Sequence, residues 1–167
     1  MISKCYIVKI LRDLDAGYRR SSSSKKALYY SKLAIIELCG WIEESMDDVV
    51  SRCAHRNLKQ AKNIKFITDK VIKMNHGFTY KENFKGMLIK VLGLITVEKI
   101  ESSANPLVKA RFESHLAALK LVRDSEAHTH LKKFTRTIDA PSVTLARFSA
   151  LYDGLKEFDS LIKKHVG

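Results

Sequence analysis

Helix-breaking residues are rare in this chain, and their scarcity limits the folds that it can adopt. Only 7 glycines and 2 prolines occur in 167 residues. An all-β fold needs more turn residues, whereas the recurring Leu, Lys, Ala, Ile and Glu favour long helices. We therefore predict an all-α fold. The length and the hydrophobic content of 46% suit one substantial core, so we expect a single domain over residues 1–167.

Apolar residues recur at spacings of three and four in several segments, which is typical of amphipathic helices. Residues 2–14 form the first segment, and Gly17 is predicted to end it. Residues 18–26 contain four consecutive serines between basic residues and are predicted to form a mobile loop. Ser24 is expected to cap a long second helix.

Three more helices are predicted after residue 79, and two of them have clear start signals. Residues 80–103 indicate one helix with Gly86 and Gly93 inside it. Asn105 followed by Pro106 supplies a capping side chain and a proline at the first position of a helix that is expected to run to about residue 123. Pro141 opens a final helix. The pattern predicts a bundle of about five helices, at least two of them long.

The cysteines predict a reducing compartment. Cys5, Cys39 and Cys53 are odd in number and widely spaced among apolar residues, so we expect buried thiols rather than disulfides or zinc ligands. Residues 1–14 include charged side chains and lack the apolar core of a signal peptide, and no run approaches a membrane span. We expect a cytoplasmic protein without a membrane segment, a bound metal or another cofactor.

The chain is strongly basic, which favours a polyanionic partner. Lys and Arg number 30 against 18 acidic residues, a formal charge of +12. We predict that RNA phosphates contact two groups, which are the ends of the serine loop (Arg19, Arg20, Lys25 and Lys26) and a stripe at helical spacing (Arg52, Arg56, Lys59 and Lys62). No aromatic residue is interleaved in the stripe, so a solvated helix face is the alternative.

A polar cluster, R-D-S-E-A-H at residues 123–128, follows an apolar helix and carries the groups that RNA scission needs. Arg123 can fork onto phosphate oxygens, and His128 can accept and give a proton near neutral pH. When the ribose 2′-OH attacks phosphorus, a base removes its proton, an acid protonates the leaving oxygen and a cation holds the developing charge. Two copies of the pair across a two-fold axis would supply all of these, so we expect a homodimer.

The segment L-V-R-D-S-E-A-H resembles the signature of the HEPN superfamily, an Arg separated from a His by four to six residues, commonly with a polar residue after the Arg, here Asp124. The segments S-K-L-A-I-I-E-L-C-G-W-I-E-E-S-M-D-D-V-V and T-R-T-I-D-A-P-S-V-T look similar to helices of RiboL-PSP-type HEPN domains. The resemblance implies a HEPN-like bundle and a metal-independent endoribonuclease. It also implies a toxin or antiviral effector, partnered by an antitoxin or a defence-complex protein. Its catalytic set would be Arg123, Asp124 and His128.

Two alternatives accompany this interpretation. His128, His130 and Asp124 could instead bind a metal, although no further cluster completes a ligand shell. The chain could also be a non-catalytic module that binds RNA or a protein partner. In HEPN toxins silenced by nucleotidyl transfer a tyrosine commonly stands where this chain has His130, which argues against that control. Glu43 and Glu44 lie on the long helix where acidic residues occur in relatives, but solvated helix carboxylates explain them equally well, so they are left outside the catalytic set.

Overall fold

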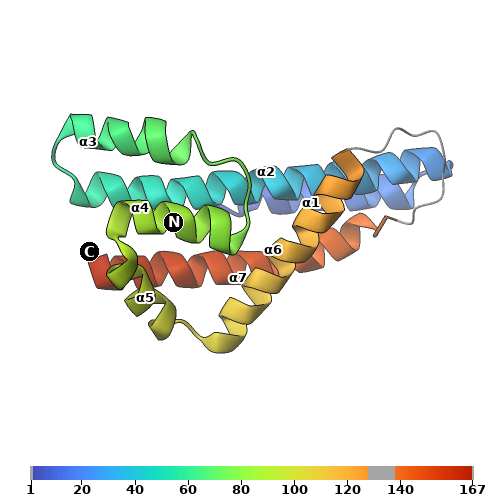
Figure 1. Ribbon diagram of the computed structural model, residues 1–167. Coiled ribbons are helices and arrows are strands. Elements are labelled where there is room, and N and C mark those ends of the chain that lie inside the picture. Colours follow the sequence, from blue (N-terminus) through green and yellow to red (C-terminus); the bar gives the residue numbers. More distant parts are fainter. Residues whose placement is uncertain (1, 128–137, 167) are drawn as a thin grey trace.

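The computed structural model describes residues 2–127 and 138–166, and in these ranges it contains helices and no strands. The predicted all-α class is confirmed. About five helices were expected, whereas the described residues form seven α-helices and two π-helical segments. The two longest helices, α2 (Ser24–Asn57) and α7 (Pro141–Val166), run side by side along the molecule (Figure 1).

Helix α1 (Cys5–Arg19) packs against α2 and α7, and it buries a row of apolar residues, Ile7, Leu11 and Leu14. The prediction that Gly17 ends this helix is wrong. Gly17 lies inside α1, where a Cβ atom would come within 2.6 Å of the Tyr30 ring. The glycine therefore permits close contact between α1 and α2.

The serine-rich connection is shorter than predicted. Helix α1 ends at Arg19 and α2 begins at Ser24, so only residues 20–23 lie between the helices. The capping residue is Ser23 rather than Ser24, because the Ser23 hydroxyl accepts a hydrogen bond from the Lys26 backbone N–H over 3.4 Å. The cap satisfies one of the backbone donors that the first turn of α2 leaves free.

Shorter helical segments form the middle of the chain. In order they are α3 (Ala61–Phe66), the π-helical segments η1 (Ile67–Ile72) and η2 (Tyr80–Phe84), α4 (Lys85–Leu92) and α5 (Leu94–Ser103). The single helix predicted over residues 80–103 is broken at Gly93, which adopts a φ of +78°. Glycine reaches this left-handed region without a steric penalty, so it separates α4 from α5.

The predicted start signals of the last two helices are confirmed. Asn105 accepts hydrogen bonds from the backbone N–H groups of Leu107 and Val108, at 2.9 and 3.3 Å, and Pro106 is the first residue of α6 (Pro106–Ala127). Pro141 opens α7. The proline ring fixes φ and lacks only a donor that has no partner in the first turn.

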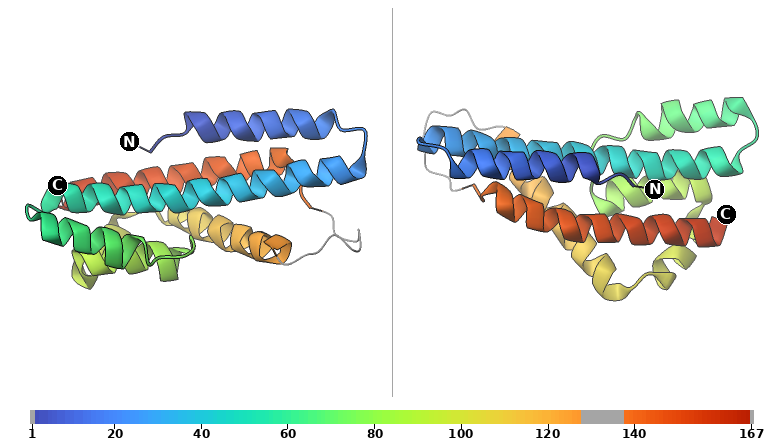
Figure 2. Two further views of the ribbon diagram at one scale, coloured as in Figure 1. Left: turned by 90° about the horizontal axis from the view of Figure 1, so that it is seen from above. Right: turned by 180° about the vertical axis from the view of Figure 1, so that it is seen from behind.

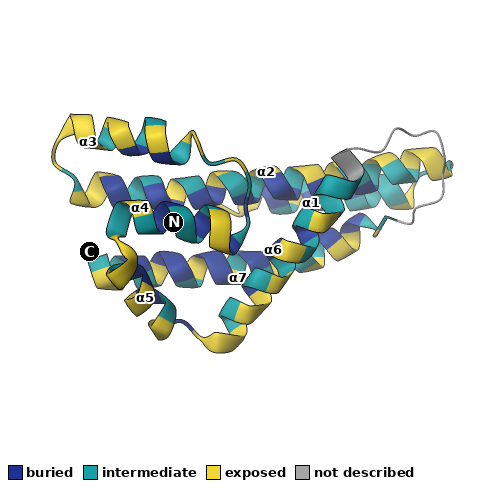
Figure 3. Cartoon of the chain, in the orientation of Figure 1, coloured by how far each residue is buried: buried dark blue, intermediate teal, exposed yellow. Residues whose placement is uncertain are grey.

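Aromatic rings join α6 to α7 in the centre of the core. Tyr80, Phe84, Phe112 and Phe158 are buried, and their ring centroids lie 5.3 to 6.4 Å apart. Buried residues line the inner faces of α2 and α7 (Figure 3). This cluster fixes the angle at which α6 crosses the long helices and hence the position of its C-terminal turns.

The helices form layers around the α2–α7 pair. Helix α1 lies on one side of the pair, and α6 with the short central helices lies on the other (Figure 2). Of the predicted buried thiols, Cys39 and Cys53 are buried, whereas Cys5 is exposed at the start of α1. Among the described helices, none combines the length and apolar character that crossing a membrane requires.

Candidate functional site

The polar cluster after the apolar part of α6 is only partly described. Arg123 and Asp124 lie in the last turns of α6, which ends at Ala127. His128 and His130 lie outside the described residues. The helix was predicted to end near Arg123, and its extra turn keeps the Arg123 and Asp124 side chains on a rigid element.

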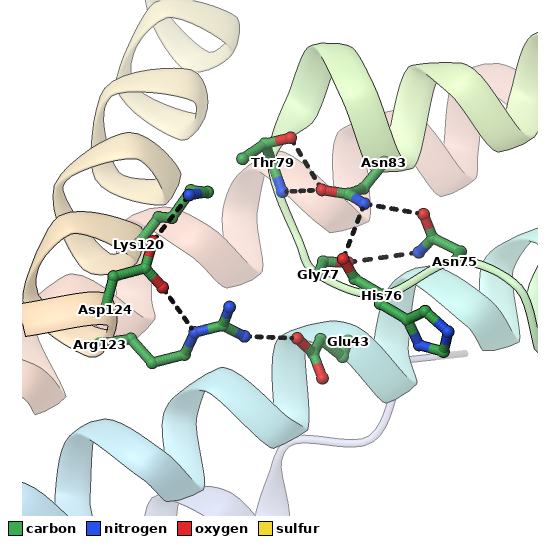
Figure 4. A network of polar contacts seen from close by, with 9 residues as sticks. All are labelled: Glu43, Asn75, His76, Gly77, Thr79, Asn83, Lys120, Arg123 and Asp124. Carbon is green, nitrogen blue, oxygen red and sulfur yellow. Dashed lines mark hydrogen bonds and ion pairs between the residues drawn. The ribbon is translucent and has the colours of Figure 1, made fainter. Parts of the chain in front are cut away.

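Two polar contacts, with Glu43 and Asp124, orient the Arg123 guanidinium (Figure 4), and an aromatic ring lies beside it. Its Nη1 donates to Glu43 Oε1 over 3.0 Å, and its Nε donates to Asp124 Oδ1 over 3.3 Å. The guanidinium carbon lies 5.1 Å from the centre of the Phe78 ring, within the range of a cation–π interaction. The Arg123 side chain nevertheless remains 34% exposed, so solvent and ligands can reach it.

The loop that carries Phe78 is held by one asparagine. Asn83 Oδ1 accepts from the backbone N–H and the hydroxyl of Thr79, at 2.9 and 2.8 Å, and Asn83 Nδ2 donates to Asn75 Oδ1 over 2.9 Å (Figure 4). Phe78 itself is buried, with 1% of its surface exposed. The loop therefore offers a fixed aromatic face against which Arg123 packs.

The Asp124 carboxylate accepts hydrogen bonds from two cationic side chains. Its Oδ2 accepts from Lys120 Nζ over 2.7 Å, and its Oδ1 accepts from Arg123. The hydrogen bond from Lys120, followed by that from Arg123, lowers the pKa of the Asp124 carboxyl. Asp124 is thus an anion near neutral pH, and its geometry suits orienting Arg123 better than removing a proton.

Glu43 was left outside the predicted site, yet it is the long-range partner of Arg123. A signal for it exists in the sequence. Glu43 follows the buried Cys39 by four residues and precedes the buried Met46 by three, which puts it beside the core face of α2. A carboxylate at such a flank is less solvated than one on the opposite side of the helix.

A second carboxyl lies one helical turn beyond Glu43. Burial raises the pKa of Asp47 to about 6, and the charges of Glu43 and Glu44 act in the same direction. Its Oδ1 is buried without a hydrogen-bond partner among the described residues. Asp47 therefore exchanges its proton closer to neutral pH than an ordinary aspartate.

The described residues contain no group of three or more His, Cys, Asp and Glu side chains that could hold a metal ion. Of the alternative metal set, Asp124 is paired with Lys120 and Arg123, and His128 and His130 lie outside the described residues.

The basic residues expected to contact RNA fall into two separate groups. Arg19, Arg20, Lys25 and Lys26 surround the turn between α1 and α2, and all four are exposed. The other group lies at the far end of α2, roughly 50 Å away for a helix of this length. The two groups do not form one continuous surface.

The predicted basic stripe does not follow one helix. Helix α2 ends at Asn57, so Lys59 lies in the connection and Lys62 on α3. Arg52 pairs with Asp48 at 2.9 Å and with the buried Asp159 at 3.2 Å, so it joins α2 to α7. Arg56 is exposed and, with Lys59 and Lys62, remains accessible to a phosphate.

No protein family matches the chain, and neither a curated protein sequence nor a solved structure matches it significantly.

Proposed function

We propose that the chain is a metal-independent endoribonuclease of the HEPN type, acting in the cytoplasm as a toxin or antiviral effector. The observation that carries the proposal is the Arg123 guanidinium, which is oriented by Glu43, Asp124 and Phe78 and is still exposed to solvent. An arginine held in this way can receive a phosphate without first ordering its own long side chain.

In the proposed reaction the ribose 2′-oxygen forms a bond to phosphorus while the bond from phosphorus to the 5′-oxygen breaks. One base takes the 2′-OH proton, and one acid gives a proton to the 5′-oxygen. We assign proton transfer to His128, which directly follows the last residue of α6 in the sequence, and stabilisation of the charged phosphorane to Arg123. In a homodimer two such pairs would face each other across the two-fold axis, one histidine acting as base and the other as acid.

A specific observation also favours a second candidate function. The Arg123–Glu43 pair joins α6 to α2, so a purely structural role explains the same contact. In that case the chain is a non-catalytic module whose basic surface binds RNA or an acidic protein partner within a toxin–antitoxin or defence complex.

Cleavage and binding of RNA, measured together in EDTA, separate the two candidates. We expect the parent protein to cleave RNA and Arg123→Lys to cleave it about 100 to 1,000 times more slowly, because lysine keeps the charge but loses the planar fork. The control is Arg111→Lys, an exposed arginine of the same helix, which should cleave normally. Binding of RNA without any cleavage by the parent protein would replace the proposal with the binding module.

A further inference from the structure

A concave site lies on the opposite side of the molecule from Arg123. Helices α1 and α7 border a cleft of about 690 Å³, a volume typical of small-molecule sites. Helix α1 and the Arg123-bearing α6 cover opposite sides of the α2–α7 pair (Figure 2). None of the contacts of Arg123 contributes to this cleft.

Cationic side chains predominate in the cleft. Lys4, Lys9, Arg12 and Lys156 line it, against two carboxylates, Asp13 and Asp153, which leaves two positive charges in excess. Among the residues that the structure describes, these four cations form no ion pair, even with the two carboxylates of the same cleft. The excess charge is therefore available to an anionic ligand.

An aromatic wall stands beside these charges. Tyr152 lines the cleft and stacks on Phe148 with ring centroids 5.8 Å apart. The Phe148 ring packs edge-on against the Trp41 ring, with centroids 4.9 Å apart. The Trp41 indole N–H donates to the Ser3 carbonyl over 2.9 Å, which fixes the ring behind Phe148. Lys4 Nζ lies 5.0 Å from the centre of the Tyr152 ring, so the end of a long, flexible side chain covers this aromatic face.

We propose that the α1–α7 cleft binds a nucleoside monophosphate. A doubly charged phosphate matches the two excess positive charges, and Arg12 can contact its oxygens as a fork. A phosphate also draws Lys4 away from the ring, and the base then stacks on Tyr152. The carboxylates of Asp13 and Asp153 accept hydrogen bonds from ribose hydroxyls.

The three cysteines provide a direct readout of binding. Cys5 lines the cleft and is exposed, whereas Cys39 and Cys53 are buried. Burial raises the pKa of Cys39 to about 12 and also raises the pKa of Cys53, so both stay protonated and react slowly. Alkylation by N-ethylmaleimide therefore reports mainly on Cys5. Trp41, the single tryptophan, reports on the aromatic wall through its fluorescence.

The test uses AMP as the probe, with inorganic phosphate and adenosine as comparisons. AMP should slow the alkylation of Cys5 and change the Trp41 fluorescence. The double variant Lys9→Gln, Arg12→Gln should bind AMP at least about tenfold more weakly, because each lost charge-assisted contact removes a strong hydrogen bond. The matched control is Lys70→Gln, Lys90→Gln, which removes two exposed charges outside the cleft and should bind AMP normally.

Three results would overturn the proposal. One is the absence of both protection and a fluorescence change at millimolar AMP. Another is equal protection by inorganic phosphate, which would indicate a general anion effect. The third is unchanged affinity in the Lys9 and Arg12 variant. Because Arg123 and Glu43 lie outside the cleft, none of these results bears on RNA cleavage.

Discussion

The Arg123 guanidinium donates to the Glu43 carboxylate over 3.0 Å, although the two residues lie 80 positions apart in the sequence. The contact exists because α6 crosses α2 at the turn that carries Glu43. Both side chains are about one-third exposed, at 34% and 37%, so the pair contributes roughly 1 kcal/mol or less to stability. Its main consequence is the direction in which the guanidinium points.

Glu43→Gln tests this orienting role. The neutral amide holds Arg123 less firmly, so we expect RNA cleavage to fall about 10- to 100-fold while the free energy of unfolding changes by about 1 kcal/mol or less. Cleavage rates and urea denaturation measure the two effects. Glu44→Gln, at the exposed neighbouring position, is the control and should cleave RNA normally. Faster cleavage by Glu43→Gln would show that Glu43 shields Arg123 instead of orienting it.

Gly154 tests how closely α7 packs against α6. A Cβ atom at this position would lie 2.5 Å from the ring of the fully buried Phe112. Gly154→Ala should therefore lower the free energy of unfolding by about 1 to 3 kcal/mol. At Gly40, inside α2, an added Cβ atom would meet no atom of the described residues within 4 Å beyond its own helix backbone, so Gly40→Ala should raise stability by about 0.5 to 1 kcal/mol. Equal effects of the two substitutions in urea denaturation would contradict this packing.

Asp47 makes stability depend on pH. Its pKa rises from 3.8 to about 6 on folding, so the folded state favours the protonated carboxyl. The stability that the folded state gains from binding this proton is fully present below pH 4 and is lost as the pH rises towards 6 and above. Asp47→Asn removes the charge. Between pH 4 and pH 7 the free energy of unfolding of the variant should therefore rise by about 1 to 2 kcal/mol relative to that of the parent. This is less than the energy equivalent of the whole pKa shift, because the side chain is partly exposed.

Urea denaturation at the two pH values measures this gain. Asp48→Asn is the control, because the neighbouring Asp48 side chain is 52% exposed, and this variant should show no such gain. A gain for Asp47→Asn that is the same at both pH values would mean that the Asp47 carboxyl titrates normally.

The turn between α1 and α2 is expected to contact RNA phosphates. Lys25→Gln with Lys26→Gln should reduce the slope of log affinity against log salt by about 1.4 for single-stranded RNA, since each neutralised phosphate contributes about 0.7. Lys70→Gln with Lys90→Gln removes the same charge elsewhere and should leave the slope unchanged. An equal decrease in both double variants would indicate a general charge effect rather than contacts at this turn.

Local signals in the sequence predicted the helix starts better than the helix ends. Asn105, Pro106 and Pro141 are residue types that favour the first positions of a helix, so they predicted the starts of α6 and α7 correctly. Gly17 and Gly93 were both misjudged, because a glycine can either break a helix or allow close packing inside it. The Tyr30 ring decides the first case and a positive φ the second.

The site depends on tertiary geometry that no local pattern contains. Periodicity placed Arg123 at the end of an apolar helix, but it could not reveal which residue of α2 that end would meet. It also could not foresee that Arg52 pairs with Asp159 on α7 instead of facing solvent. Long-range ion pairs follow from helix crossing angles, which the packing of the central aromatic rings sets.

Cleavage of RNA by His128→Ala in EDTA tests the central claim most directly. We predict that the parent protein yields fragments with cyclic phosphate and 5′-hydroxyl ends, and that His128→Ala cleaves about 100 to 10,000 times more slowly with RNA affinity nearly unchanged. His165→Ala, at an exposed histidine near the end of α7, should cleave like the parent. Loss of the parent's cleavage in EDTA, or unchanged cleavage by His128→Ala, would contradict the proposed mechanism.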